Sequence, residues 1–147
     1  MLTRFMLTPA GMAFDRFLVR WTGHSLMNRL FARAAGIKAR PALLLVTRGR
    51  RSGKDRAVAL PWFEHDGKRF VVGSKGGAPQ DPHWVTNLRA HPEARIVLDR
   101  RTRPVRTRIA EGAEHDALWA AATAAVPGYA EYQKLTTRRI PMVVIEG

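Results

Sequence analysis

The sequence predicts an α+β fold, mainly β, in which a small antiparallel sheet or barrel follows a helical N-terminus. Three observations support this prediction. After residue 41 the chain holds six short runs rich in β-branched and aromatic residues, separated by Gly, Pro and Asp turns. These runs do not alternate regularly with helices, which argues against a doubly wound parallel sheet. Before residue 41 the apolar period is helical. We therefore expect a basic amphipathic helical N-terminus over residues 1–40 and a β-rich domain over residues 41–147.

The N-terminal part carries an amphipathic helical pattern over residues 12–35, which Gly23 can break or kink. Its first apolar stripe is formed by Phe14, Phe17, Leu18 and Trp21. Arginines fall between the apolar positions, at Arg16, Arg20, Arg29 and Arg33. Such a stripe either packs on its own domain or lies on an anionic membrane surface, and the pattern alone leaves both open.

The β-rich part reads as an ordered series of strands and short helices. Strands are expected over residues 42–47, 56–64, 69–74, 95–99, 103–110 and 140–146. Helices are expected over residues 83–90, 114–125 and 129–135. Asp66 and Gly67 are expected to form a tight hairpin turn. Asp81, just before Pro82, is expected to cap the first of these helices.

Composition excludes several classes of protein. The chain has 147 residues, enough for one hydrophobic core, and contains no cysteine, so disulfides, thiolate metal sites and a cysteine nucleophile are ruled out. Its five histidines lack the spacing of a zinc site. No apolar run reaches the roughly 18 residues of a membrane span. Pro9 and Gly11 interrupt the uncharged stretch over residues 5–14, so we expect no signal peptide and a cytoplasmic protein.

The net charge of +13 is unevenly distributed. Residues 1–54 hold eleven basic side chains and one acidic side chain, Asp15. This asymmetry favours an anionic partner of the N-terminal third, which is either nucleic acid, a membrane surface or a polyanionic ligand. The sequence shows no helix-turn-helix, RRM or zinc-finger pattern, so nucleic acid is the least favoured of the three.

A basic loop over residues 48–53 lies between the first two expected strands. Its glycines allow close approach of the backbone, and its arginines suit bidentate contact with phosphate. The candidate ligand-binding residues here are Arg50, Arg51, Ser52, Lys54 and Arg56. The segment precedes a strand and is no Walker loop, so it is either a phosphate site or a solvated basic turn.

A glycine turn over residues 74–77 follows the third expected strand, where Gly76 and Gly77 expose backbone amides and Lys75 adds positive charge. Trp84 and Asn87 lie three residues apart on the next helix and share a face, so Trp84 is either core or the wall of a ligand site. Farther on, Tyr129 and Tyr132 share a helical face as well. No Ser-His-Asp set or carboxylate pair is recognisable, so a bound cofactor would have to supply any chemistry.

Three motifs, in this order and spacing, resemble the deazaflavin-dependent nitroreductase family, whose members use reduced coenzyme F420. They are GRRSGxxR over residues 49–56, VVGSKGGAPxxPHWxxNLRAxP over 71–92 and PGYAEYQxxTxRxIPMVVIE over 127–146. The resemblance implies a split β-barrel related to FMN-binding split barrels. It also implies hydride transfer from reduced F420 to a quinone or nitroaromatic acceptor. Several members of the family associate with membranes through a basic N-terminus, which implies a peripheral position on the inner face of the cell membrane.

The resemblance also assigns roles to the candidate residues. Arg51, Ser52 and Arg56 would meet the phosphate and tail of F420, with Arg50 and Lys54 adding positive field. Ser74, Lys75, Gly76 and Gly77 would lie beside its ring and linker, and Trp84 and Asn87 would wall the groove. Ser74, Tyr129 and Tyr132 would be the catalytic groups on the acceptor side. Leu135 stands where prodrug-reducing members can carry an aromatic residue, so a quinone is the expected acceptor.

Two other functions remain open from the sequence. One is a non-catalytic split barrel that holds F420, FMN or haem, and the other is a basic nucleic-acid-binding module. The sequence leaves the oligomeric state open.

Overall fold

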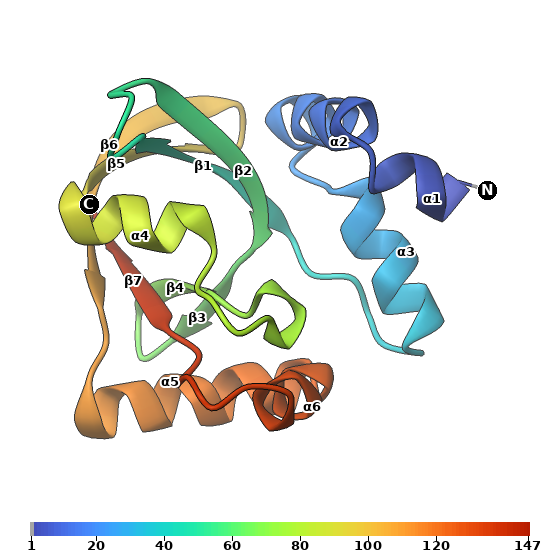
Figure 1. Ribbon diagram of the computed structural model, residues 1–147. Coiled ribbons are helices and arrows are strands. Elements are labelled where there is room, and N and C mark those ends of the chain that lie inside the picture. Colours follow the sequence, from blue (N-terminus) through green and yellow to red (C-terminus); the bar gives the residue numbers. More distant parts are fainter. Residues whose placement is uncertain (1) are drawn as a thin grey trace.

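The computed structural model describes residues 2–147 (Figure 1). Its helices are α1 Leu2–Met6, α2 Pro9–Thr22, α3 Leu26–Ala34, α4 His83–Ala90, α5 Gly112–Ala125 and α6 Gly128–Lys134. Its strands are β1 Ala42–Arg48, β2 Asp55–Pro61, β3 Phe63–His65, β4 Lys68–Val72, β5 Glu93–Leu98, β6 Arg101–Ile109 and β7 Met142–Glu146. A 3₁₀ turn, η1, covers Lys75–Gly77.

The strands form one antiparallel sheet of seven strands in the order β2-β1-β5-β6-β7-β4-β3. The two edge strands, β2 and β3, are consecutive in sequence, and only Trp62 lies between them. Because two residue steps span at most about 7 Å, the ends of the edge strands must lie close together. The sheet therefore curls into a half-barrel (Figure 1), as predicted for this part of the chain.

Two hydrophobic clusters lie on the two faces of the curled sheet. Side chains alternate along the central strands, so that Val71 and Val143 belong to one cluster and Phe70 and Val144 to the other. The first cluster is completed by Trp84, Val85 and Leu88 of α4, which lies across the opening of the curl (Figure 1). The second is completed by α5 and α6. The sheet is thus covered on both faces.

The N-terminal helices lie beside the half-barrel rather than within it (Figure 1). The expected helix over residues 12–35 is broken, because Gly23 has a φ of 70° and ends α2. Ser25 caps α3 and donates to the buried carboxylate of Asp15 at 2.6 Å. Val19 of α2 packs on the sheet against residues such as Leu44. None of the helices within residues 2–147 is long and apolar enough to cross a membrane.

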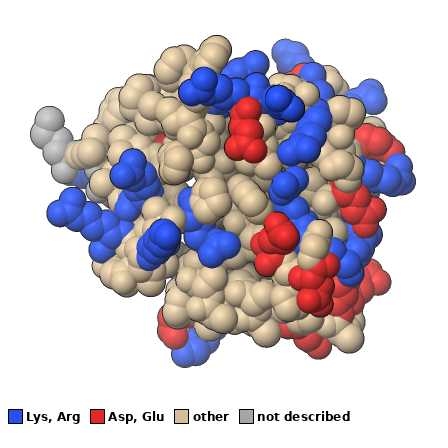
Figure 2. Space-filling model, turned by 180° about the vertical axis from the view of Figure 1, so that it is seen from behind, with Lys and Arg blue, Asp and Glu red and all other residues tan. Residues whose placement is uncertain are grey.

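Charge is segregated over the surface as the sequence indicates. Seen from behind, Lys and Arg side chains predominate over the side of the N-terminal helices, and Asp and Glu side chains gather toward the opposite side (Figure 2). Among the acidic side chains, Glu114 bonds to Arg108 and Lys68, which lowers the pKa of its carboxyl to about 2. The charge of this carboxylate is therefore balanced within the fold.

Two local predictions are wrong. The expected strand over residues 56–64 is two strands, because Trp62 carries the chain from one edge of the sheet to the other. Asp81 does not cap α4, whose N-cap is Pro82 and makes no side-chain cap. The Asp81 carboxylate pairs instead with Arg89 and Arg138, at 2.6 and 2.8 Å. Two ion pairs satisfy the carboxylate better than one capping bond does.

Candidate cofactor and active site

The glycine turn, residues 74–77, presents a row of free backbone amides. Ser74 is in the right-handed helical region and Lys75 has a φ of 45°, a sequence of conformations that directs successive N–H groups into one concavity. Within residues 2–147 the N–H groups of Ser74, Lys75 and Gly76 have no hydrogen-bond partner. The Gly77 N–H, in contrast, donates to the Ser74 carbonyl at 2.9 Å. Three amides and the exposed Lys75 side chain therefore form a positive concavity suited to an electron-rich ligand.

The two glycines of this turn serve different purposes. Gly76 has a φ of 61°, and an added Cβ would meet nothing within 4 Å. Gly77 has a φ of 80°, and an added Cβ would lie 2.5 Å from the carbonyl oxygen of Tyr132. Gly77 is thus required for close packing of the turn on α6. This packing brings Tyr132 to the turn, although the two lie far apart in sequence.

Asn87 anchors the basic loop to α4. Its side-chain carbonyl accepts from the backbone N–H of Arg50 at 3.2 Å and from the Arg50 guanidinium at 3.0 Å. Its amide donates to Thr47 at 3.1 Å. Asn87 and Trp84 are both buried, and Trp84 packs in the core within the curl. Both side chains are therefore part of the buried interior next to the basic loop, and their role as a wall of the cofactor groove stays a prediction.

The remaining cations of the basic loop face solvent. Arg51, Lys54 and Arg56 are exposed and form no ion pair with any residue of the described chain. The Ser52 hydroxyl accepts from the Lys54 N–H at 3.2 Å and so stabilises the turn itself. The loop lies at one end of α4, since Arg50 also bonds to His83 at 3.3 Å. Its positive charge is therefore free to bind an anion.

The two tyrosines differ in exposure. Tyr129 is 7% exposed and its ring centroid lies 6.0 Å from that of Phe63, whereas Tyr132 is 37% exposed. Burial, together with a smaller effect of neighbouring Tyr132, raises the pKa of Tyr129 to about 12. Tyr129 therefore stays protonated at neutral pH and acts as a neutral group. Arg40 stacks on the other side of this aromatic cluster, 4.4 Å from the Phe63 centroid.

Arg138 contributes to the site and was not singled out from the sequence. Its guanidinium donates to the backbone carbonyls of Gly73, Ser74 and Ala78, which flank the glycine turn on both sides. The only sequence signal was its place in the third motif, TxR, where it is one of two adjacent arginines. Its partners lie about 60 residues earlier in the chain, so no local pattern could reveal them.

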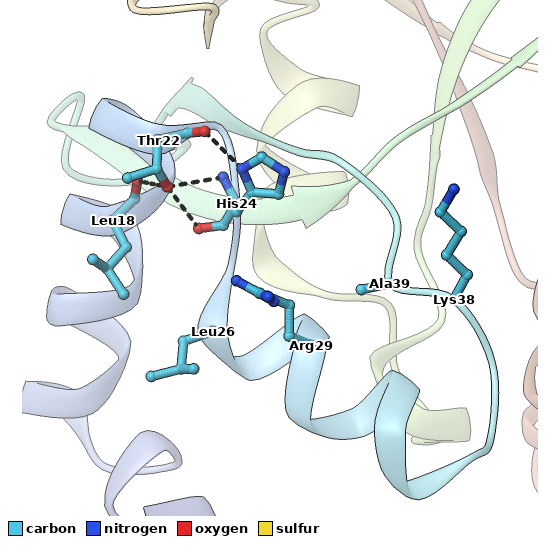
Figure 3. Close-up of a pocket in the computed structure, with 7 residues that line it drawn as sticks. All are labelled: Leu18, Thr22, His24, Leu26, Arg29, Lys38 and Ala39. Atoms are coloured by element: carbon cyan, nitrogen blue, oxygen red, sulfur yellow. Dashed lines mark hydrogen bonds between the residues drawn. The ribbon is translucent and has the colours of Figure 1, made fainter.

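Two cavities lie away from the predicted site residues. One of about 480 Å³ opens between α2, α3 and the segment leading to β1, and Arg29 extends into it from α3 (Figure 3). Another of about 270 Å³ lies at the ends of β4 and β7. None of the predicted site residues lines either cavity. The candidate site thus comprises the glycine turn, the basic loop and the neighbouring part of α6.

This architecture defines the class of protein. A half-barrel of antiparallel strands with a helix across its curl is a split β-barrel. The haem storage protein HutZ of Vibrio cholerae has the same fold at 13% identity, with a TM-score of 0.50 over 71% of this chain and 80% of that one. A solved structure of an F420-H2 dependent reductase, FDR-A, is 41% identical with a TM-score of 0.65, over 73% of this chain and 95% of that one.

Sequence comparison identifies the family to which this split barrel belongs. The family model for F420H(2)-dependent quinone reductases matches residues 24–147. The F420H(2)-dependent quinone reductase Rv1261c of Mycobacterium tuberculosis is 30% identical over 146 residues, which cover 91% of this chain and 98% of that protein. The chain therefore belongs to the F420H(2)-dependent quinone reductase family, a family of oxidoreductases. The resemblance and the split-barrel fold expected from the sequence are confirmed.

Proposed function

We propose that this chain is an oxidoreductase that uses reduced coenzyme F420 to reduce a quinone. Family membership supports this reaction. The observation that locates the cofactor site is the row of backbone N–H groups without hydrogen-bond partners at residues 74–76. When bound, reduced F420 supplies a hydride. Its deazaflavin ring has carbonyl acceptors and its phosphate and glutamyl tail are anionic. A concavity of N–H donors flanked by unpaired cations fits such a molecule.

The chain's own groups would divide the binding between two surfaces. Lys75 and the amides of the glycine turn would bind the polar edge of the ring and its linker. Arg51, Ser52 and Arg56 would bind the phosphate and tail, while Arg50 and Lys54 add positive potential. Asn87 contributes indirectly, because it fixes the backbone of Arg50. Trp84 contributes by supporting α4 from the core.

On the acceptor side, α6 supplies the groups nearest to the turn. The backbone of Tyr132 lies against Gly77 and its side chain is partly exposed, so we expect the ring and hydroxyl to contact an acceptor bound near the turn. The buried Tyr129 would hold Tyr132 in place by an edge-on contact at 6.3 Å. Donors from Ser74 or a tyrosine would stabilise negative charge that develops on a quinone or nitro oxygen.

Mixing the purified protein with reduced F420 and menadione tests this function. We expect oxidation of the cofactor that depends on both protein and quinone, and none with FMN or NADPH as the reductant. A parallel reaction with a nitroaromatic acceptor decides whether the family's second acceptor class is used. Bound F420 with no turnover of any quinone would indicate a non-catalytic carrier, and a haem or FMN spectrum in the purified protein would indicate a different cofactor. Either result would contradict the proposed reaction.

Substitution of the tyrosines separates their roles. We expect Tyr132→Phe to lower kcat for menadione by about tenfold, because one hydrogen bond to developing charge is lost. Tyr129→Phe should change kcat less than twofold, since the buried ring packs in the same way without its hydroxyl. Ser74→Ala identifies the second candidate donor. Steady-state kinetics at neutral pH check all three, and equal kcat values for Tyr132→Phe and wild type would remove Tyr132 from the acceptor side.

A second proposal concerns where the protein acts. Phe17 and Trp21 of α2 are 57% and 53% exposed, so these two aromatic residues of the apolar stripe are not buried against the domain. Exposed aromatic residues beside arginines are typical of a helix that lies on an anionic bilayer. We infer a peripheral position on the membrane, where quinones are dissolved.

Vesicle flotation tests the membrane proposal. The full chain should float with vesicles that contain anionic lipid, and the double variant Phe17→Ser with Trp21→Ser should remain at the bottom. Arg106→Ser with Arg139→Ser removes two exposed cations whose ion-pair partners are Glu93 and Asp116, and it serves as the control. Binding that survives loss of both aromatic residues would mean that charge alone attracts the protein.

A further inference from the structure

We propose that Arg138 is a positioning residue that holds the glycine turn in the conformation that binds the cofactor, and that Asp81 orients the Arg138 guanidinium for this purpose. This inference rests on the proposed function, because it names what shapes that site. Arg138 need not touch the cofactor to act in this way. It would act through the main chain of residues 73–78.

The contacts of Arg138 surround the turn. Its Nη1 donates to the Gly73 carbonyl at 3.1 Å and its Nη2 to the Ser74 carbonyl at 2.6 Å, on the entry side of the turn. Its Nε donates to the Ala78 carbonyl at 2.8 Å, on the exit side. One planar guanidinium group thus forms hydrogen bonds with both ends of the turn.

The direction of the free amides follows from these bonds. In a trans peptide the carbonyl of one residue and the N–H of the next lie in one plane and point in opposite directions. Because the Gly73 and Ser74 carbonyls point toward Arg138, the N–H groups of Ser74 and Lys75 must point away from it. Two of the three unpartnered amides are therefore directed outward by one side chain.

The turn needs such support. Lys75, Gly76 and Gly77 have φ values of 45°, 61° and 80°, so three successive residues lie in the left-handed region. For Lys75 this conformation is unfavourable, and it persists only where neighbouring contacts impose it. Charge-assisted hydrogen bonds to the flanking carbonyls are the strongest contacts that this segment makes.

Arg138 is itself held in place. Its side chain is 14% exposed and its charge is balanced by Asp81, whose Oδ1 accepts from Nη1 at 2.8 Å. The other oxygen of Asp81 accepts from Arg89 of α4 at 2.6 Å. The backbone carbonyl of Arg138 accepts from Gln133 of α6 at 2.7 Å. The guanidinium is therefore fixed from α4 and α6 at once.

The neighbouring arginine offers a matched control. Arg139 is 55% exposed and pairs only with the exposed Asp116. Arg139→Ala therefore removes the same side chain and the same charge one residue away, without touching the turn. Arg138→Lys keeps the charge at the original position but loses the planar fork that reaches three carbonyls.

Two measurements together test the inference. Hydrogen exchange reports the bonds that the Gly77 and Ala78 N–H groups make to Ser74 and Lys75, independently of any cofactor. Titration with F420 and steady-state kinetics report binding and turnover. For Arg138→Ala and Arg138→Lys we expect faster exchange at these two amides and about tenfold weaker F420 binding. We also expect a higher KM for reduced F420, with kcat for menadione changed less than twofold. Asp81→Asn should show the same pattern more weakly, and Arg139→Ala should match wild type.

The experiments distinguish failure of the positioning role of Arg138 from failure of the proposed function. If Arg138→Lys exchanges faster at Gly77 and Ala78 yet binds F420 as wild type does, or if its exchange is unchanged, Arg138 does not position the site. The proposed function then still stands. If wild type itself binds no F420, the proposed function fails and this inference fails with it. Should Arg138→Ala not fold, Arg138→Lys and Asp81→Asn decide.

Discussion

Gly77→Ala is expected to abolish F420 binding and to lower the free energy of unfolding by about 3 kcal/mol. The new Cβ would lie 2.5 Å from the Tyr132 carbonyl oxygen, and the residue would have to keep a φ of 80°. The turn must therefore separate from α6 or leave the left-handed region. Either change dismantles the concavity of free amides and displaces Tyr132. Denaturant unfolding and F420 titration measure the two effects.

Gly76→Ala is the matched control for this substitution. Its φ of 61° carries the left-handed penalty of about 1 kcal/mol, but the added Cβ meets nothing within 4 Å. The stability loss should be correspondingly smaller, and F420 binding should be retained in part. Equal losses from the two variants would show that packing of the turn on α6 is unimportant.

Removal of two cations from the basic loop should have the second large effect. The double variant Arg51→Ala with Arg56→Ala is expected to weaken F420 binding by about a hundredfold at low ionic strength, at roughly 1.5 kcal/mol for each charge-assisted contact. The deficit should shrink as salt is added, because salt screens the attraction that remains in wild type. Lys75→Ala should weaken binding in the same direction. Isothermal titration at several salt concentrations checks these expectations.

A control variant that loses the same net charge distinguishes direct contacts with F420 from the effect of the protein's overall positive charge. Arg101 and Arg103 are exposed on β6, and their double alanine variant loses the same net charge elsewhere on the surface. We expect its F420 affinity to stay within about threefold of wild type, since charges beyond a Debye length are screened. Comparable losses in the two double variants would assign the effect to net charge and not to the basic loop.

The sequence predicted helices, strands and turns well where neighbouring residues in the chain determine them. The hairpin at Asp66 and Gly67 was expected from two turn residues, and both have left-handed φ values, of 50° and 74°. Helix α4 was expected with its observed bounds, because Pro82 directly precedes it and its apolar residues share a face. The strand order was not predictable in this way, since it depends on pairings such as that of β6 with β7, far apart in the chain.

Within the candidate site, the sequence predicted which segments expose charged side chains better than it predicted what each side chain contacts. Lys75, Arg51 and Arg56 are exposed, as a ligand-binding role requires, whereas Trp84 and Asn87 are buried. The expected cap at Asp81 failed because Arg138, which lies far away in sequence, supplies a stronger partner. The division of the chain near residue 40, the roles of the individual site residues and the membrane position stay predictions.

In the proposed site the glycine turn would bind its ligand with main-chain groups, which has a consequence for how such a site can change during evolution. An amide N–H is common to every residue except proline, so exchange of the side chain at position 75 leaves the donors in place. What the concavity depends on is backbone shape, and that shape is set by Gly77 and by an arginine that lies across the fold. The row of amide donors is thereby insensitive to the side chain at position 75 and sensitive to change in residues that never meet the ligand.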